Sequence, residues 1–282
     1  MDKQTAMEWE IKPGTRWFEL NLRELFSYKD LLLRLVRRDF LMLYQQTLLG
    51  PVWIILQPLL TVFTYILIFD LIIGIPTNGI PPFLFYLTGI TIWNLFADIF
   101  TGLAGTFVNN INIFSKVYFP RMIIPLATTL LHFSRILIQL LLLIGVILFY
   151  YFSGKLVIKP ETWILAVIPL LLTGFIALGC GLIFAVFIAK YRDLMNLLQL
   201  LVRLLLFVSP VFFAVSLVPE RLRWIINLNP LSPLFELFRY ALVGEGTFSI
   251  PGILYSSCAA IVLLLGGIVL FNKKADTLVD VV

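Results

Sequence analysis

Residues 163–189 read WILAVIPLLLTGFIALGCGLIFAVFIA and contain no charged side chain. A helix needs about 20 apolar residues to cross the hydrocarbon core of a bilayer, so this stretch is long enough to span one. Five other stretches are similarly apolar, and their apolar residues run continuously instead of alternating as in a membrane β-barrel. We therefore expect six transmembrane helices, because lipid offers no partner to unpaired backbone groups. Their expected ranges are 52–73, 83–108, 122–152, 163–189, 197–217 and 251–271.

The composition of the whole chain agrees with a membrane protein. Of its 282 residues, 60 % are hydrophobic and 13 % are charged, and the mean hydropathy is +0.99. Soluble domains carry about 25 % charged residues. These values exclude a soluble enzyme, a disordered chain and a nucleic-acid-binding module. The expected fold class is therefore an all-α polytopic membrane protein with no nucleic-acid partner.

The positions of the basic residues predict the orientation of the chain. With the N-terminus inside, 14 of the 21 Lys and Arg residues fall in inner segments and 5 in outer segments. Positive charge collects on the cytoplasmic side of membrane proteins. Both termini are therefore expected to be cytoplasmic, and the net charge of +5 is mostly this topological signal.

Residues 28–50, which precede the first expected span, begin with an amphipathic pattern. Its apolar side consists of Leu32, Val36, Phe40 and Leu43, and its polar side of Arg34, Arg37, Arg38 and Gln45. This pattern predicts a helix along the cytoplasmic surface, where the arginines contact anionic headgroups. Gly50 and Pro51 then turn the chain into the first span.

The outer connection, residues 218–250, contains the stretch LSPLFELFRYALV at 231–243. This stretch is too apolar for an ordinary loop and too short to span the membrane. Prolines interrupt the chain before it, and Gly244 and Gly246 follow it. A short re-entrant helix in the outer leaflet fits this pattern best, and a surface amphipathic helix is the alternative.

Three charged residues, Asp98, Arg135 and Arg203, lie inside the expected spans. The rise per residue of a helix places them at similar depths, so Asp98 can pair with Arg135 or with Arg203. Charges within the membrane are costly and normally face the protein interior. One interpretation is a structural ion pair. The other is that two arginines against one aspartate leave positive charge for an anionic group of the substrate.

Aromatic side chains are abundant, with 25 Phe, 10 Tyr and 6 Trp. Many fit interfacial belts or helix packing. A second interpretation is a conduit for a sugar chain, because aromatic faces pack against the apolar faces of sugar rings. The conduit candidates are Phe63, Tyr65, Phe69, Phe85, Tyr86, Phe96, Phe100, Phe207, Phe212 and Phe213.

The sequence offers little for catalysis or metal binding. It contains no Gly-x-x-x-x-Gly-Lys-Ser/Thr pattern, so the chain cannot hold nucleotide phosphates in the P-loop manner. His132 is the only histidine, which excludes a His-rich metal site and disfavours a His-dependent catalytic triad. We therefore expect no metal site and no catalytic residue in this chain.

Three motifs in register resemble the polysaccharide-exporting ABC-2 permeases. The first, YKDLLLRLVRRDFLMLYQQTLLGPVWIILQPLL at 28–60, combines a dibasic-Asp helix, a Tyr-x-x-Thr-x-Leu-Gly turn, Trp53 and Pro58. The second is FSKVYFPRMIIPL at 114–126, between the second and third expected spans. The third is NPLSPLFELFRYALVG at 229–244, on the outer side. With the six spans, the resemblance covers essentially the whole chain, and the upstream IKPGTRWFELNLRELF resembles the leader of O-antigen exporters in this family.

The resemblance implies the permease subunit of an ATP-driven transporter in the bacterial inner membrane. Its substrate would be a lipid-linked polysaccharide, O-antigen-like or teichoic-acid-like. Two copies of the permease would form a homodimer around a conduit, and two copies of a separate P-loop ATPase would bind ATP and Mg²⁺. No cofactor is then expected in this chain, which would not be an enzyme on its own.

The resemblance also assigns roles to residues. Residues 109–121 would form the segment that couples to the ATPase, with contact candidates Asn109, Asn110, Asn112, Phe114, Lys116, Tyr118, Phe119, Pro120 and Arg121. The interfacial helix would help receive the substrate, with candidates Arg34, Arg37, Arg38 and Tyr44, although membrane anchoring explains the arginines equally well. Residues 218–250 would form an outer gate, with candidates Asn229, Pro230, Glu236 and Arg239.

The chain is thus expected to divide into a cytoplasmic segment (1–27), an interfacial helix (28–50), a six-span domain (51–271) and a cytoplasmic tail (272–282). Within the same superfamily, a drug- or lipid-exporting permease is the alternative. From another class, an ion-coupled carrier would need broken helices and midplane acids, for which Asp98 is a single weak candidate. A membrane-embedded sugar or acyl transferase ranks last, because the lone His132 lies within the third expected span.

Overall fold

The computed structural model describes residues 22–110, 119–157, 159–247 and 249–279. Every regular element in these residues is helical, which confirms the all-α class. The first half contains α1 (Leu22–Ser27), α2 (Lys29–Tyr44), α3 (Trp53–Tyr65), α4 (Pro82–Ala104), α5 (Thr106–Asn109) and α7 (Ile123–Phe152). The second half contains α8 (Val167–Lys190), α9 (Leu194–Val208), α10 (Glu220–Leu228), α11 (Ser232–Val243) and α12 (Ile250–Val279). The 3-10 turn Gly50–Val52 and the π-helical stretch Ile66–Ile72 extend α3 at its two ends, and the 3-10 turn Pro160–Ala166 extends α8. A separate 3-10 turn, Val215–Leu217, lies between α9 and α10.

Five helical stretches of the described chain are long and apolar enough to cross a membrane. They are Gly50–Ile72, Pro82–Ala104, Ile123–Phe152, Pro160–Lys190 and Ile250–Lys274. Each corresponds to one of the six ranges expected from the sequence.

The remaining expected range, 197–217, does not form one continuous helix. Its helix is α9, which has 15 residues and ends at Val208. Ser209 has extended backbone (φ −83°, ψ 146°) and precedes Pro210. A residue before proline is driven out of the helical region, and proline cannot continue the helix. The apolar residues that follow therefore belong to an irregular segment and not to the helix.

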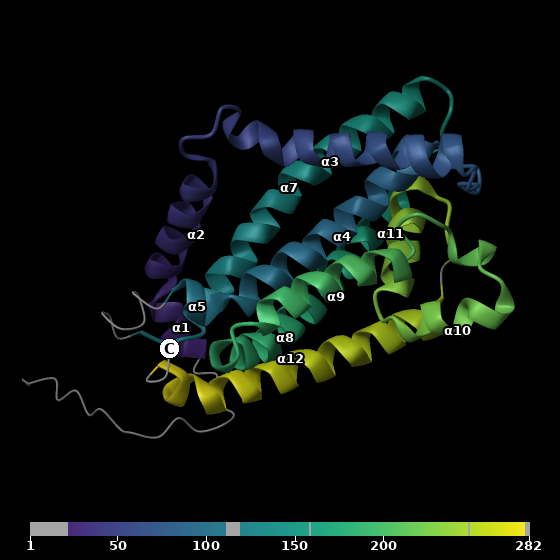
Figure 1. Cartoon of the computed structure of the whole chain (residues 1–282). Coiled ribbons are helices and arrows are strands. Elements are labelled where there is room, and N and C mark those ends of the chain that lie inside the picture. The colour runs from purple at the N-terminus through teal and green to yellow at the C-terminus, as the bar shows by residue number, and fades with distance from the viewer. Residues whose placement is uncertain (1–21, 111–118, 158, 248, 280–282) are drawn as a thin grey trace, which may run out of the picture.

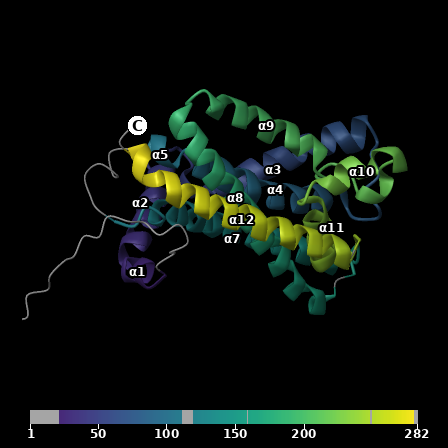
Figure 2. The same ribbon diagram turned by 90° about the horizontal axis from the view of Figure 1, so that it is seen from below.

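The long helices run along a common bundle, and α9 runs beside them (Figure 1). Helix α2 lies across one end of this bundle, together with α1 and the C-terminal end of α12. Helices α10 and α11 occupy the opposite end. The view from below shows the same separation of the two ends (Figure 2).

Helix α4 forms the centre of the bundle. Of its apolar window, 78 % is buried, against 17 % for the windows of the first and last long helices. Its neighbours are α3, α7, α8, α9 and α11. Helices α3 and α12 therefore turn most of their apolar surface outward, as expected where lipid or another subunit covers them.

The closest helix packing joins α8 to α12 through two glycines. A Cβ built on Gly179 would lie 2.4 Å from the backbone carbon of Leu263, and one built on Gly267 would lie 2.6 Å from the carbonyl oxygen of Gly179. Small residues allow such approach between membrane helices. The two backbones are therefore in direct contact at this point.

We predict that Gly179→Ala lowers the thermal stability of the detergent-purified chain. The methyl group must push against backbone, which does not move aside as a flexible side chain does, and overpacking costs about 1–3 kcal/mol. Gly145→Ala is the matched control, because a Cβ at Gly145 in α7 has no neighbour within 4 Å. Both changes raise helix propensity equally. An equal melting temperature for the two variants would contradict the close packing.

Candidate functional sites at the two ends of the bundle

The helix that crosses the bundle end is held by an apolar cluster of its own. Leu35 of α2 is buried against Phe119 and the first turns of α7, with Leu32 and Val36 packed beside it. Leu43, expected on the same apolar side, is 48 % exposed. The apolar cluster therefore uses residues in the first half of α2.

The turn between α2 and the first long helix forms where the sequence predicts it. The Thr47 hydroxyl donates to the carbonyl of Tyr44 at 2.9 Å, and Gly50 has φ +53° before Pro51 begins the next helical turn. Among the candidate residues for receiving substrate, Arg34 and Arg37 are exposed. Arg38 pairs with its neighbour Asp39 at 2.6 Å. All three arginines are thus accessible at this bundle end, since 40 % of the Arg38 side chain is exposed although its guanidinium is paired.

A cluster of polar side chains lies between α4 and α7 within the bundle. Arg135 Nη1 is 3.0 Å from Asp98 Oδ2 and 3.3 Å from His132 Nδ1. A guanidinium has no acceptor, so it donates to both atoms. Gly102 of α4 makes room for the imidazole, since a Cβ there would lie 2.9 Å from His132 Nε2. We call Asp98, His132 and Arg135 the midspan cluster.

Tyr44, the last residue of α2, reaches the midspan cluster through Arg135. Burial raises the pKa of Tyr44 above its ordinary value, while the charge of Arg135 and a hydrogen bond to its side chain act in the opposite direction. The phenol therefore stays neutral at physiological pH. The crosswise helix is thus connected by one side chain to the paired charges between α4 and α7.

Of the two partners that sequence spacing allows for Asp98, the structure selects Arg135. Arg203 is exposed on α9 and forms no ion pair within the described part of the chain. His132 was not foreseen as a member of this cluster. The available signal was its position three residues before Arg135 on one helix, which places both side chains on the same face.

At the opposite end of the bundle, Glu236 and Arg239 of α11 form a buried pair. Their side chains are 6 % and 2 % exposed, and Arg239 Nη1 lies 3.5 Å from Glu236 Oε1. Burial lowers the pKa of Arg239 to about 10, with the neighbouring Glu236 acting against this change, so the guanidinium stays charged at neutral pH. The guanidinium carbon of Arg239, Cζ, lies 3.8 Å from the ring centroid of Phe85 in α4, a close cation–π geometry.

This pair binds the irregular segment that follows α9. Arg239 Nη2 donates to the carbonyl of Val211 at 3.1 Å, and the Val215 amide donates to Glu236 Oε1 at 3.3 Å. The other carboxylate oxygen accepts from the amide of Thr247, just before α12, at 3.2 Å. We call this arrangement the outer clasp, because α11 thereby holds the segments on both sides of it.

Gly89, Asn229 and Pro230 make further contacts at the outer clasp and beside it. Gly89 of α4 admits the guanidinium, since a Cβ there would lie 3.1 Å from Arg239 Nη2. The Asn229 side chain donates to the Ser209 hydroxyl at 3.0 Å, and the carbonyl of Pro230 accepts from Ser256 at 2.7 Å. All four gate candidates from the sequence therefore contact neighbouring elements, while Gly89 gave no signal of its role.

The ten conduit candidates divide into three groups. Phe85, Tyr86, Phe96, Phe100 and Phe212 are buried in the core, and Phe63 and Phe207 are 59 % and 61 % exposed. The other three, Tyr65, Phe69 and Phe213, are partly buried. Phe212 joins several of them, with ring centroids 4.7 Å from Tyr65, 4.4 Å from Phe69 and 5.5 Å from Phe207. An aromatic layer thus runs from Tyr65 at the end of α3 to the exposed Phe207 near the end of α9, while the exposed Phe63 packs separately against Phe83, with ring centroids 5.7 Å apart.

The candidates for coupling lie partly outside the described residues. Asn112, Phe114, Lys116 and Tyr118 belong to 111–118, which the structure does not describe. Asn109 is exposed, and Asn110 donates to the carbonyl of Thr106 at 3.0 Å. Phe119 is buried against Leu35, so its ring serves contacts within the chain. Pro120 and Arg121, partly buried, lead into α7.

The described residues contain no group of three or more His, Cys, Asp or Glu side chains arranged to hold a metal. Both cysteines, Cys180 and Cys258, are free thiols. The chemistry of the two sites is therefore that of paired charges and hydrogen bonds.

Known proteins resemble this chain over most of its length. The family described as "ABC-2 type transporter" matches residues 30–243. A Klebsiella pneumoniae protein named O-antigen export system permease protein RfbA is 29 % identical over 255 residues, covering 90 % of this chain and 94 % of the relative. A second Klebsiella pneumoniae protein of that name is 29 % identical over 257 residues, with the same coverage. A Myxococcus xanthus protein, also of that name, is 23 % identical over 260 residues, which cover 90 % of this chain and 96 % of the relative.

Proposed function

Because the chain belongs to the ABC-2 type transporter family, we propose that it is the permease subunit of an exporter for a lipid-linked, O-antigen-like polysaccharide. The observation that carries this proposal is the match to O-antigen export permeases over 90 % of the chain. ATP hydrolysis would be supplied by a separate subunit, since the sequence has no P-loop. The membrane would be the bacterial inner membrane, where such a carrier-linked glycan meets ATP.

We propose six membrane crossings, with α9 as the fifth and shortest. The crosswise α2 and the end of α12 lie at one end of the bundle, which supports an even number of crossings (Figure 1). The excess of basic residues supports the cytoplasm as the side of this end. Helices α10 and α11 would then lie at the outer face, with α11 as a re-entrant gate.

We further propose that two copies form the conduit along α3 and α9. The exposed aromatic rings Phe63 and Phe207 lie on these helices, as does Arg203, which forms no ion pair with any residue that the structure describes. Rings without a polar pattern tolerate a sliding sugar chain, and Arg203 would meet an anionic group such as the carrier's phosphate. Arg34 and Arg37 on α2 would attract the same group at the cytoplasmic surface.

The alternatives differ in how well they fit the midspan cluster. An ion-coupled carrier needs an acid that releases and rebinds its cation, and Asp98 is instead paired with Arg135 at 3.0 Å. A teichoic-acid-like or other lipid-linked substrate would fit the same architecture. The exporter of a glycan therefore remains the function that the geometry supports best.

Co-purification tests the assignment. We predict that the full chain, expressed with the product of a neighbouring ATPase gene, purifies as two permeases with two ATPases. Phe114→Asp should lower the ATPase recovered roughly tenfold or more, as expected for loss of an apolar anchor at an interface. Phe152→Asp is the control, because Phe152 is 81 % exposed at the other end of α7.

Two results would count against the proposal. The permease assignment fails if the chain purifies without any ATPase under conditions in which both are expressed. The coupling role of residues 109–121 fails if Phe114→Asp and Phe152→Asp recover the same amount of ATPase.

A further inference from the structure

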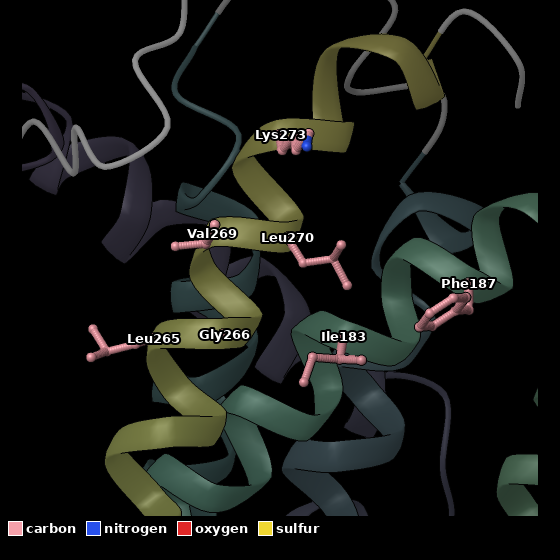
Figure 3. Close-up of a pocket in the computed structure, with 7 residues that line it drawn as sticks. All are labelled: Ile183, Phe187, Leu265, Gly266, Val269, Leu270 and Lys273. Carbon is pink, nitrogen blue, oxygen red and sulfur yellow. The ribbon is translucent and has the colours of Figure 1, made fainter.

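Two hollows of the structure differ in the side chains that line them. The depression between α8 and α12 has apolar walls except at Lys273 (Figure 3). Nothing in it selects one ligand over the lipid chains that surround a membrane protein. A second hollow, of about 310 Å³, lies at the opposite end of the bundle, among α10, α11 and the start of α12 (Figure 1). We call it the outer pocket, and six of its ten lining residues are polar: Asn227, Ser232, Glu236, Thr247, Ser249 and Tyr255.

Rigid side chains give the outer pocket flat apolar walls. Pro233 comes from the first turn of α11, while Pro251 and Tyr255, four residues apart, share one face of α12. The Tyr255 hydroxyl donates to the carbonyl of Leu228 at 2.7 Å, which fixes the ring, and 42 % of this residue is exposed. The Tyr255 ring therefore offers an apolar face against which the C–H groups of a sugar ring can pack.

The polar side chains of the outer pocket combine donors with acceptors. Asn227 and Ser249 are exposed, and an amide and a hydroxyl can each donate and accept. Glu236 accepts hydrogen bonds of 3.2–3.4 Å from Val215 and Thr247. A carboxylate offers about four acceptor sites, so Glu236 keeps capacity for another donor. A ligand with several hydroxyl groups therefore finds partners for both roles of each hydroxyl.

The charges of the outer pocket argue against other classes of ligand. Its lining includes no Lys or Arg, so a phosphate or carboxylate group has no cation to bind. Its one acid, Glu236, is already paired with Arg239, so the attraction for a cation is weak. Six polar side chains disfavour an acyl chain, because burying them against hydrocarbon leaves their hydrogen bonds unmade. A neutral, hydroxyl-rich ring is the ligand class that fits.

A second polar pocket, of about 160 Å³, adjoins the outer pocket, because Glu236 and Thr247 line both. Its lining also includes Asn78 and Ser216, and Asn78 Nδ2 donates to Ser216 Oγ at 2.7 Å. Asn78 lies in the loop between α3 and α4, and Ser216 in the segment after α9. Polar side chains thus continue from beyond the ends of the two proposed conduit helices to the outer pocket.

We propose that the outer pocket binds a neutral sugar unit of the exported glycan after the glycan leaves the conduit. The sugar ring packs on Tyr255, and its hydroxyl groups bind Asn227, Ser249 and Glu236. This inference rests on the proposed export function and on the outer position proposed for α11. It adds a binding site outside the conduit that retains the emerging glycan on the outer side.

Fluorescence anisotropy of a labelled glycan tests the outer pocket. The probe is the surface glycan of the organism that makes the chain, released from its lipid by mild acid and labelled at its reducing end. It is titrated with the full chain purified in detergent. Asn227→Ala should weaken binding roughly three- to tenfold, as expected for the loss of one hydrogen bond.

A larger side chain at the same position tests the space. Asn227→Trp places an indole ring in the pocket and should weaken binding roughly tenfold or more. Leu222→Trp is the matched control, because Leu222 is 52 % exposed on the same helix and does not line the pocket. Its binding should equal that of the unmodified chain.

Two variants of Tyr255 separate the ring from its hydroxyl. Tyr255→Phe keeps the ring and should bind the glycan within about twofold of the unmodified chain, whereas Tyr255→Leu should bind roughly tenfold more weakly. The thermal midpoint of each variant shows whether it folds. Equal losses in the two folded variants would contradict packing of the sugar on the ring.

The export function and the outer pocket can fail separately. Absence of glycan binding by the unmodified chain would overturn the proposal, as would full binding by Asn227→Trp, since the glycan would then bind elsewhere. Export is measured independently, as the surface glycan of cells that lack the gene. Surface glycan that is lost with the gene but not bound by the purified chain would refute the outer pocket alone. Surface glycan that persists without the gene would refute both proposals.

Discussion

Arg135→Ala is expected to lower the thermal midpoint of the detergent-purified chain by roughly 6–12 °C. The change leaves the Asp98 carboxylate inside a membrane helix without its partner at 3.0 Å. An unpaired charge at the centre of a membrane helix costs about 2.5–3.5 kcal/mol on insertion scales. The Arg135→Ala change also removes the hydrogen bond between Tyr44 of α2 and the Arg135 side chain. Intrinsic fluorescence during heating provides the measurement.

Arg203→Ala is the matched control for this variant. It removes the same side chain from a similar depth, but Arg203 is exposed and has no ion-pair partner in the described part of the chain. Its thermal midpoint should stay within about one degree of the unmodified chain, because most surface substitutions change stability by at most about 0.5 kcal/mol. If Arg203→Ala is destabilised as much as Arg135→Ala, the pairing of Asp98 is not what stabilises the midspan cluster.

The same pair of variants separates structure from substrate handling. Arg203→Ala should fold normally yet reduce export of a carrier-linked glycan, if its guanidinium meets an anionic group. Unchanged export by folded Arg203→Ala would remove Arg203 from the conduit. The sequence left open whether the second arginine serves the ion pair or the substrate, and this comparison decides it.

Arg239→Ala is expected to destabilise the chain by about 3–5 kcal/mol, the range for breaking a buried pair by removing one partner. The variant leaves the Glu236 carboxylate buried, frees the Val211 carbonyl and empties the space above Phe85. Arg221→Ala is the control, since Arg221 is exposed on the neighbouring α10. The measurement is again the thermal midpoint of the purified chain.

A double variant shows whether the pairing itself matters. Glu236→Gln combined with Arg239→Met removes both charges and keeps similar volumes, so it should be more stable than Arg239→Ala. A double variant less stable than Arg239→Ala would mean that the outer clasp acts through its individual hydrogen bonds and not through charge balance.

Much of this architecture could be predicted from the sequence because long apolar runs leave few choices. Five expected spans became long helices, and the turn at Gly50 and Pro51 is where the glycine and proline indicate. Asp98 and Arg135 could be paired because charges inside spans are rare and a helix fixes their depth. The exclusion of a P-loop needed only the sequence.

The failures have physical causes. The expected span 197–217 was too long because the residues after Val208 stay apolar, and only Ser209-Pro210 marks the break. The outer clasp could not be predicted in full, since Gly89 and Val211 meet Arg239 through tertiary packing alone. The amphipathic pattern predicted for α2 did not include Leu35, its buried residue. The sequence does not reveal that Phe119 and the start of α7 pack against this position.

The shortness of α9 has a consequence for how the chain enters the membrane during synthesis. At 15 residues it is about 22 Å long, less than the hydrocarbon thickness of about 30 Å, and it carries Arg203. A segment that is short and carries a charge has a weak tendency to insert from the translocon into the bilayer without help from other segments. The irregular segment that follows α9 has two backbone groups, the Val211 carbonyl and the Val215 amide, whose partners are side chains of α11, and the ribosome makes α11 only afterwards. If α9 crosses the membrane as proposed, its insertion is expected to become complete only after α11 has emerged and bound the segment between them.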